Sequence, residues 1–169
     1  FVHNKSTIPE PWAYEVQKIG FNYRLTDIQS ALAASQLKKI NFFLKKRFKI
    51  AKKYHEAFEH NTYIRPLHEL TKNSSYHLFI VKINFRSLKI SKKDFMIKLS
   101  KQNIFTQVHY IPIPMQNIYL EKNYSMNYLV NSAQYYEEAI SIPIFYSLTK
   151  LEQDLVIEKI LDLIKINVK

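Results

Sequence analysis

The sequence has no cysteine and only one glycine, Gly20, in 169 residues. Without cysteine, disulfides, thiol catalysis and cysteine-ligated zinc sites are excluded. One glycine cannot build a glycine-rich phosphate loop, and no P-loop, GxGxxG or HExxH pattern occurs, which excludes nucleotide folds of those kinds. No run of about 18 apolar residues is present, and the opening FVHNKSTIPEPW lacks the apolar core of a signal peptide. We therefore expect a cytoplasmic protein with no membrane partner.

Acidic residues are scarce beside basic ones, because 25 Lys and Arg face 14 Asp and Glu and give a net charge of +11. This surplus favours anionic partners such as phosphates, nucleotides, nucleic acid or acidic lipid headgroups. Hydrophobic residues make up 47% of the chain, which is enough for one ordinary core and argues against disorder. The chain starts at Phe1 instead of Met, so we expect a fragment or a processed product.

The first part of the chain, residues 1–24, shows no sustained periodicity and predicts an extended, loop-rich segment. Thr26 and Gln29 then have the spacing of a capping box, which predicts the start of a helix. Apolar residues recur from there at three- and four-residue spacing as far as Phe58, so we expect one long helix, kinked near Asn41.

The other face of this helix is basic. A solvated face is one interpretation, and a nucleic-acid contact is the other. The residues concerned are Lys38, Lys39, Lys45, Lys46, Lys49, Lys52 and Lys53.

The remainder predicts an α/β or α+β unit. SYHLFIVKINF and IFTQVHYIPI are dense in β-branched and aromatic residues and predict strands, the second halted by Pro112 and Pro114. Ser91 predicts the cap of a helix over KKDFMIKLSK, and YLVNSAQYYEEAI predicts another, followed by a short extended SIPIF. Thr149 and Glu152 repeat the capping-box spacing and open a final helix.

The histidines give no metal-ligand pattern, since His55 and His60 are five residues apart and do not share a helix face. His77 lies within a predicted strand, where a structural role is expected. His109 ends a predicted strand before a proline-locked turn, a position where binding groups collect. A half-buried histidine bonded to the backbone is the alternative there. Tyr135, with its neighbour Tyr136, is interpreted as a packing residue.

Asn22 and Arg24 flank Tyr23 just before the capped helix. The backbone N–H groups and the positive end of the helix dipole favour an anion at such a place, so a phosphate contact is one interpretation. An ordinary turn asparagine is the other.

Four motifs in order carry a resemblance to a known family. They are PWAYEVQKIGFNYRLTDIQSALAASQLKKI, SSYHLFIVKI, QNIFTQVHYIPI and YYEEAISIPIFYSLTKLEQDLVIEKI. Together they resemble the carboxy-terminal half of the sugar aminotransferases of the DegT/DnrJ/EryC1/StrS family. The first motif is most similar to the branch that aminates UDP-linked 4-keto-6-deoxy-N-acetylhexosamines, as in the pseudaminic acid pathway.

The resemblance implies a fold-type I transferase that depends on pyridoxal 5′-phosphate (PLP), with glutamate as amino donor and a nucleotide sugar as substrate. It implies a homodimer with shared active sites and a role in surface polysaccharide or glycan biosynthesis. By this resemblance Asn22 reaches the cofactor phosphate of the neighbouring subunit. His109, Tyr110 and Arg24 are assigned to substrate binding.

Two features depart from the family pattern. The lysine that forms the Schiff base with PLP belongs to the amino-terminal half, so we expect no catalytic residue here and no activity from this chain alone. Many relatives also carry a histidine where this sequence has Pro114, so contacts of that histidine do not transfer.

The resemblance predicts three parts: residues 1–25 as the end of a large cofactor domain, 26–60 as a connecting helix, and 61–169 as a small α/β domain. The alternative to the enzyme fragment is a stand-alone basic α+β module that binds nucleic acid or acidic surfaces through Lys38–Lys53.

Overall fold

The computed structural model describes residues 19–120 and 128–169. The chain divides into two compact units, Phe1–Lys38 and Lys39–Lys169.

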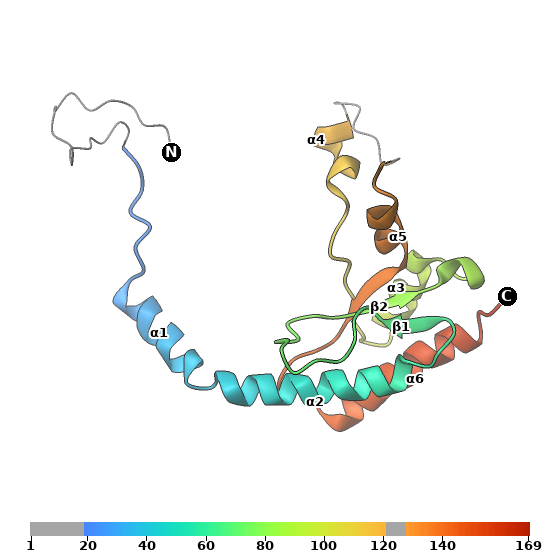
Figure 1. Ribbon diagram of the computed structural model, residues 1–169, viewed down its shortest axis with the longest axis horizontal. Coiled ribbons are helices and arrows are strands. Elements are labelled where there is room, and N and C mark those ends of the chain that lie inside the picture. Colours follow the sequence, from blue (N-terminus) through green and yellow to red (C-terminus); the bar gives the residue numbers. More distant parts are fainter. Residues whose placement is uncertain (1–18, 121–127) are drawn as a thin grey trace. The chain divides into compact units, whose positions relative to one another are not determined.

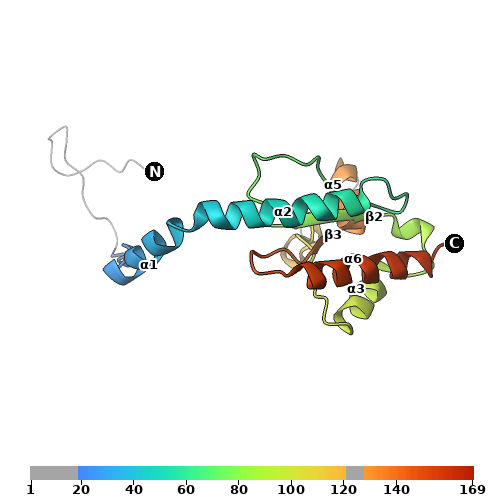
Figure 2. The same cartoon turned by 90° about the horizontal axis from the view of Figure 1, so that it is seen from below.

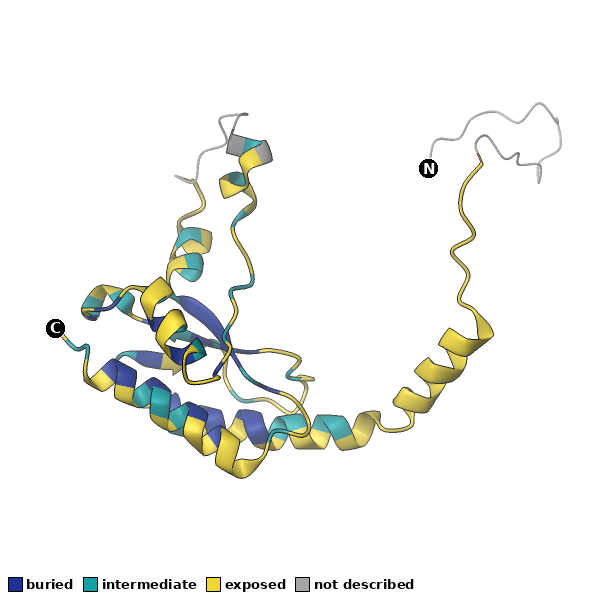
Figure 3. Ribbon diagram, turned by 180° about the vertical axis from the view of Figure 1, so that it is seen from behind, coloured by how far each residue is buried: buried dark blue, intermediate teal, exposed yellow. Residues whose placement is uncertain are grey.

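The first unit contributes α1 (Asp27–Leu37) to the described residues. Thr26 caps it: the Thr26 side chain accepts from the backbone of Gln29, and the Gln29 side chain accepts from the backbone of Thr26. The predicted capping box is therefore confirmed. Every described residue of this unit is exposed (Figure 3), so α1 buries no apolar face within the part of the chain that the structure describes.

The second unit combines an antiparallel sheet with helices (Figure 1). Its strands are β1 (Ile64–Pro66), β2 (Phe79–Ile83) and β3 (Ala139–Ile142). Its α-helices are α2 (Ile40–Phe58), α3 (Lys92–Ser100), α4 (Asn117–Leu120), α5 (Val130–Glu138) and α6 (Lys150–Lys165), and its 3-10 turns are η1 (Phe85–Ser87) and η2 (Ile113–Met115).

The sheet has the order β1-β2-β3, and β2 pairs with both neighbours. Ile64 lies opposite Ile83 in the first pair, and Phe79 opposite Ile142 in the second. Along β2 buried residues alternate with half-buried ones, the period of two that a strand imposes on side-chain direction. This alternation directs Phe79, Val81 and Ile83 into the core.

Helices α2 and α6 lie side by side on one side of the sheet (Figure 2). The ring of Tyr54 on α2 packs 5.2 Å from that of Phe79, centroid to centroid, which joins this helix to the sheet. Val156, Ile160, Leu163 and Ile164 bring the apolar face of α6 into the same core. The core therefore lies between the sheet and these helices.

Several sequence predictions are confirmed. Ser91 caps α3 and Thr149 caps α6, the latter with the reciprocal Glu152 contact of a capping box. The strand expected from SYHLFIVKINF is present as β2, and SIPIF begins within β3. The α+β character of the unit follows from these elements.

Other expectations were wrong. The predicted single helix is two helices, because Lys38 and Lys39 form a turn between α1 and α2. Residues 104–113 are not a strand: Gln107 makes one isolated antiparallel bridge with Ser141, and the prolines that follow cannot donate ladder hydrogen bonds. Strand β1 was missed because it has only three residues and ends on a proline. The three predicted domain boundaries stay a prediction.

Among the helices in the described ranges, none has both the length and the apolar character needed to cross a lipid bilayer.

Candidate cofactor and substrate contacts

Asn22 forms a local turn just before α1. Its side-chain Oδ1 accepts a hydrogen bond from the backbone N–H of Arg24 at 3.1 Å. This contact occupies the amide oxygen and orients the Nδ2 group, which has no partner among the described residues. Asn22 thus offers two hydrogen-bond donors to a ligand, which suits a phosphate better than a cation.

The start of α1 contributes less to such a site than the sequence suggested. The N–H of Gln29 is already bonded to Thr26, and the carboxylate of Asp27 lies in the first turn, where it interacts with the positive end of the helix dipole. The remaining positive charge is that of Arg24, whose guanidinium has no partner within the described ranges. Asn22 and Arg24 together therefore fit an anion, with the amide as the fixed donor.

Gly20 does not have the left-handed backbone that would require a glycine. A Cβ added there would meet nothing within 4 Å. Within the described residues, neither backbone angle nor space explains why this position holds the single glycine. Phe21 and Tyr23 beside it are both exposed, with their rings edge to face and centroids 6.1 Å apart.

His109 lies two residues after the bridge that joins Gln107 to β3. The two backbone hydrogen bonds of that bridge measure 3.1 Å and 2.8 Å and join Gln107 to Ser141 in both directions. The His109 Nδ1 atom lies 3.1 Å from the hydroxyl oxygen of Ser141, which is buried. The His109 ring is half-buried and is held edge to face against Tyr110, centroid to centroid at 4.8 Å.

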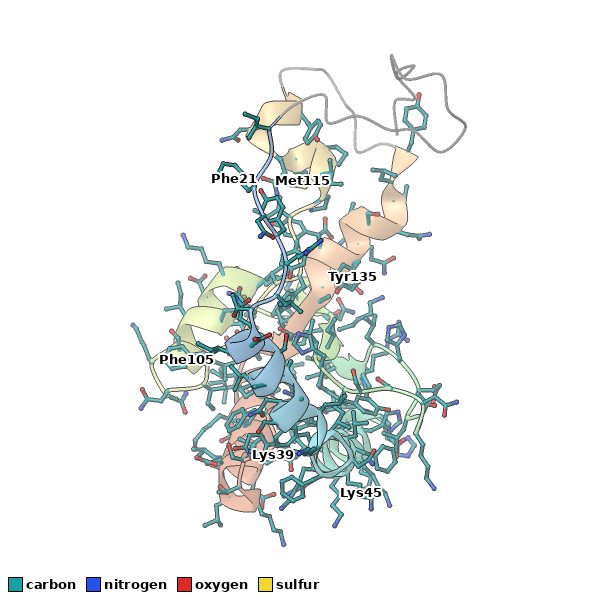
Figure 4. All side chains as sticks on the ribbon, turned by 90° about the vertical axis from the view of Figure 1, so that its left-hand side faces the viewer. Phe21, Lys39, Lys45, Phe105, Met115 and Tyr135 are labelled. Carbon is teal, nitrogen blue, oxygen red and sulfur yellow. The ribbon has the colours of Figure 1, made fainter. Side chains whose placement is uncertain are left out.

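Tyr110 is exposed and lines a cavity of about 500 Å³. Figure 4 labels Tyr135 on α5 and Met115 on η2, the two elements that border it. Burial raises the pKa of the Tyr135 hydroxyl, so this phenol stays protonated and can donate a hydrogen bond. The other lining residues are Ile111, Pro112, Ile113, Pro114, Leu129, Asn131 and Ser132.

A second cavity of about 760 Å³ lies between α3 and α5. Lys92 borders it, donates from Nζ to the carbonyl of Tyr136 at 2.5 Å, and lies 5.0 Å from the centroid of the Tyr136 ring. Burial lowers the pKa of Lys92. Tyr136, interpreted from sequence as a packing residue, therefore also holds a lysine.

The structure brings the predicted residues together in two pairs. Asn22 and Arg24 are joined by a hydrogen bond in the first unit, and His109 and Tyr110 are in ring contact in the second. Ser141 was not predicted from the sequence as a partner of His109. Its one local signal was a hydroxyl side chain between the isoleucines of ISIPIF, a polar residue inside a buried strand.

His77 was predicted within a strand, but it is exposed and precedes β2. Its carbonyl accepts from Arg47, so its role is structural through the backbone. His55 is paired with Glu59 at 2.9 Å. Across the described residues, no group of three His, Asp or Glu side chains is arranged to hold a metal ion.

The basic face of α2 is partly neutralised. Lys52 lies 3.6 Å from Glu56, one helical turn later, and Lys53 pairs with Asp154 of α6. These acids reduce the positive field that a nucleic-acid surface requires. The face fits the solvated interpretation better than the nucleic-acid one.

The chain belongs to the DegT/DnrJ/EryC1/StrS aminotransferase family, whose model matches residues 3–161. This family is PLP-dependent. The structures to which the chain is similar include a putative sugar aminotransferase of Streptococcus pneumoniae in the PLP form and in the pyridoxamine phosphate form. The resemblance found in the four sequence motifs is thereby confirmed.

The chain is similar to individual proteins of known pathways. The chain is 39% identical over 130 residues to the UDP-4-amino-4,6-dideoxy-N-acetyl-beta-L-altrosamine transaminase of Helicobacter pylori, covering 76% of this chain and 34% of that protein. It is 29% identical over 157 residues to the spore coat polysaccharide biosynthesis protein SpsC of Bacillus subtilis, covering 91% of this chain and 40% of SpsC.

Solved structures agree on the fold. Helicobacter pylori PseC, an aminotransferase of pseudaminic acid biosynthesis, matches with a TM-score of 0.79 at 33% identity, covering 92% of this chain and 42% of PseC. Such neighbours are fold-type I PLP aminotransferases, so the predicted fold class is confirmed. The chain spans less than half the length of these relatives.

Proposed function

We propose that this chain is the carboxy-terminal part of a PLP-dependent aminotransferase that moves an amino group from glutamate to a UDP-linked 4-keto-6-deoxy sugar. The product would enter surface polysaccharide or glycan biosynthesis. The observation that carries this proposal is the similarity to Helicobacter pylori PseC, which extends over 92% of the chain at a TM-score of 0.79. The proposed location is the cytoplasm.

PLP, when bound, supplies the electron sink and carries the amino group between the two substrates. The part assigned to this chain is binding and orientation. Asn22 is positioned for a phosphate because the Arg24 N–H holds its amide oxygen and the Nδ2 donors have no partner in the described part of the chain. A charge-assisted hydrogen bond from Nδ2 to a phosphate oxygen would anchor the cofactor.

The second unit is assigned to the nucleotide sugar. Its candidate contacts are His109, Tyr110 and the cavity of about 500 Å³ beside them. Asn131, Ser132 and Tyr135 on α5 give this cavity amide and hydroxyl groups that suit sugar hydroxyls. Pro114 borders the same cavity and contributes no donor, so specificity there depends on Tyr110 and on the groups of α5.

The lysine that binds PLP covalently is proposed to lie outside this chain, in the part of the relatives that it does not cover. We also propose that the active protein is a homodimer in which Asn22 serves the partner's cofactor. On this account residues 1–25 complete the cofactor domain and 61–169 form the small domain.

Spectroscopy of the protein encoded by the whole reading frame tests this function. It should purify with the visible absorbance of bound PLP, lose that band with glutamate, and regain it with a UDP-4-keto-6-deoxy sugar. The 169-residue chain alone should show no such band. An intact, folded full-length protein that binds no PLP would contradict the proposal.

A further inference from the structure

The hydroxyl of Ser141 contacts two groups at once. Its Oγ lies 3.2 Å from the carbonyl oxygen of Gln107 and 3.1 Å from Nδ1 of His109. A serine hydroxyl has one hydrogen to donate, and a carbonyl oxygen can only accept. The contact with Gln107 therefore uses the Ser141 hydrogen.

The remaining contact determines which nitrogen of His109 is protonated. Since the Ser141 hydrogen is directed to Gln107, Oγ can only accept from His109, so the ring must donate from Nδ1. In a neutral imidazole one nitrogen donates and the other accepts, which leaves Nε2 as the acceptor. A tautomer set by a partner of the other ring nitrogen is the arrangement by which proteins direct histidine chemistry.

The residues that form this contact are held in place by the sheet. Ser141 is 7% exposed in β3, a strand whose four residues are all buried. Its backbone N–H and carbonyl both bond to Gln107, so the segment that carries His109 is attached to the sheet directly beside the hydroxyl. The ring of Tyr110 also contacts His109, edge to face. These contacts fix the imidazole before any ligand arrives.

The Nε2 atom is open. No group in the described part of the chain bonds to it, and it is not one of the buried side-chain atoms that lack a partner there. It is therefore accessible as a hydrogen-bond acceptor, next to the exposed Tyr110 that lines the cavity assigned to the sugar.

We propose that Ser141 is a positioning residue that holds His109 in the Nδ1–H tautomer, so that Nε2 accepts a hydrogen bond from a hydroxyl or N–H of the nucleotide sugar. The ligand assignment rests on the proposed function, whereas the tautomer follows from the contacts of Ser141 alone. Free neutral histidine favours the Nε2–H tautomer. The Nδ1–H tautomer proposed for His109 therefore differs from that of an unconstrained ring.

Long-range ¹H–¹⁵N correlation spectra of the ¹⁵N-histidine-labelled chain test the tautomer without any enzyme assay. They are recorded in mildly alkaline buffer. His109→Gln identifies the resonances. The wild-type chain should carry the hydrogen on Nδ1. A hydrogen on Nε2 of the wild-type ring would overturn the proposal, with no variant needed.

Ser141→Ala removes the acceptor, and the hydrogen should move to Nε2. Ser100→Ala is the matched control, because the Ser100 hydroxyl also donates to a backbone carbonyl, that of Ile97, and this contact involves no histidine. It should leave the His109 spectrum unchanged. An unchanged tautomer in a folded Ser141→Ala chain would show that the serine does not set it, and the proposal would fail.

Steady-state kinetics of the full-length protein test the ligand contact. Ser141→Ala should raise KM for the UDP-4-keto-6-deoxy sugar by about tenfold, the factor expected for one lost hydrogen bond, and leave KM for glutamate unchanged. An unchanged sugar KM beside a shifted tautomer would refute the ligand contact. A protein that binds no sugar, with the Nδ1–H tautomer intact, would instead refute the proposed function.

Discussion

Gln153 of α6 donates a hydrogen bond from Nε2 to the backbone carbonyl of Ile50 on α2, at 2.8 Å. Gln153 is one of two buried polar residues within the described ranges, and this bond joins residues of two helices that are 103 positions apart in sequence. It supplies a directional contact between α2 and α6.

Gln153→Glu should therefore lower the free energy of unfolding by about 1–3 kcal/mol, because it replaces the donor by an acceptor that faces a carbonyl in a buried place. Urea denaturation at neutral pH measures it. Gln102→Glu is the matched control: that glutamine also contacts a carbonyl, that of Lys98, but is exposed, and its change should be close to zero. Equal effects at the two positions would contradict the buried role.

Arg47 on α2 should also stabilise the folded state. Its Nη1 atom lies 2.9 to 3.1 Å from the carbonyl oxygens of Tyr76, His77 and Ile144, which joins the helix to the loop before β2 and to the chain after β3. We expect Arg47→Met to cost about 1–3 kcal/mol of unfolding free energy, since three carbonyls lose a charged donor.

Hydrogen exchange of residues 76–80 should accelerate in the same variant, because the loop is then held by fewer contacts. Arg86→Met serves as control, since Arg86 is exposed and pairs with Glu137, and exposed pairs contribute about 0–1 kcal/mol. Exchange of 76–80 at the wild-type rate in the Arg47 variant would argue against the contact.

Stability should fall in acid partly through Glu138. Burial acts to raise the pKa of this carboxyl, but hydrogen bonds from Gln134 and Lys82 and the charges of Lys82 and Arg65 outweigh it and lower the pKa below 4.5. A group whose pKa is lower in the folded state stabilises above its unfolded value, and that stability is lost as the pH falls through the folded value.

Glu138→Gln should therefore flatten the loss of unfolding free energy below pH 4.5, measured by denaturant titrations across that range. Glu56→Gln, which alters the exposed pair with Lys52, should keep the wild-type slope. A slope unaffected by Glu138→Gln would show that this ion pair does not contribute.

Removal of residues 1–38 should leave the melting temperature of the chain unchanged. No described residue of this segment is buried, and the core residues identified all lie between Ile50 and Ile164. Differential scanning calorimetry of the two lengths gives the comparison. A markedly lower melting temperature for residues 39–169 would mean that the first unit supports the core.

Asn22→Ala should weaken PLP binding to the full-length protein by about tenfold or more, because one charge-assisted hydrogen bond is lost. Asn41→Ala, at an exposed position in the first turn of α2, is the matched control and should bind PLP as the wild type does. Fluorescence titration measures the affinity for PLP. If the two variants bound PLP equally well, Asn22 would not contribute to the cofactor site.

Local signals in the sequence predicted much of this fold. The caps at Thr26, Ser91 and Thr149 depend on residues three apart, so they can be recognised without knowing the tertiary structure. The periodicity of α2 and the aromatic and β-branched content of β2 are equally local. Where the prediction was wrong, as in residues 104–113, strand-like composition was present but only Gln107 found a partner on the sheet.

The candidate site was predicted only in part. Asn22, Arg24 and His109 were identified by motifs and position. The partner of His109 was not, because Ser141 is 32 residues away in sequence and is brought to the imidazole only by the pairing of β3 with Gln107. The helix break at Lys38–Lys39 likewise has no proline or glycine to mark it.

Transfer of labelled nitrogen tests the central claim most directly. The full-length protein is incubated with ¹⁵N-glutamate and a UDP-4-keto-6-deoxy sugar, and the sugar product is analysed by mass spectrometry. The account predicts an amino sugar that carries ¹⁵N, formed only when PLP and glutamate are both present. A folded, PLP-loaded protein that leaves the ketosugar unlabelled would contradict it.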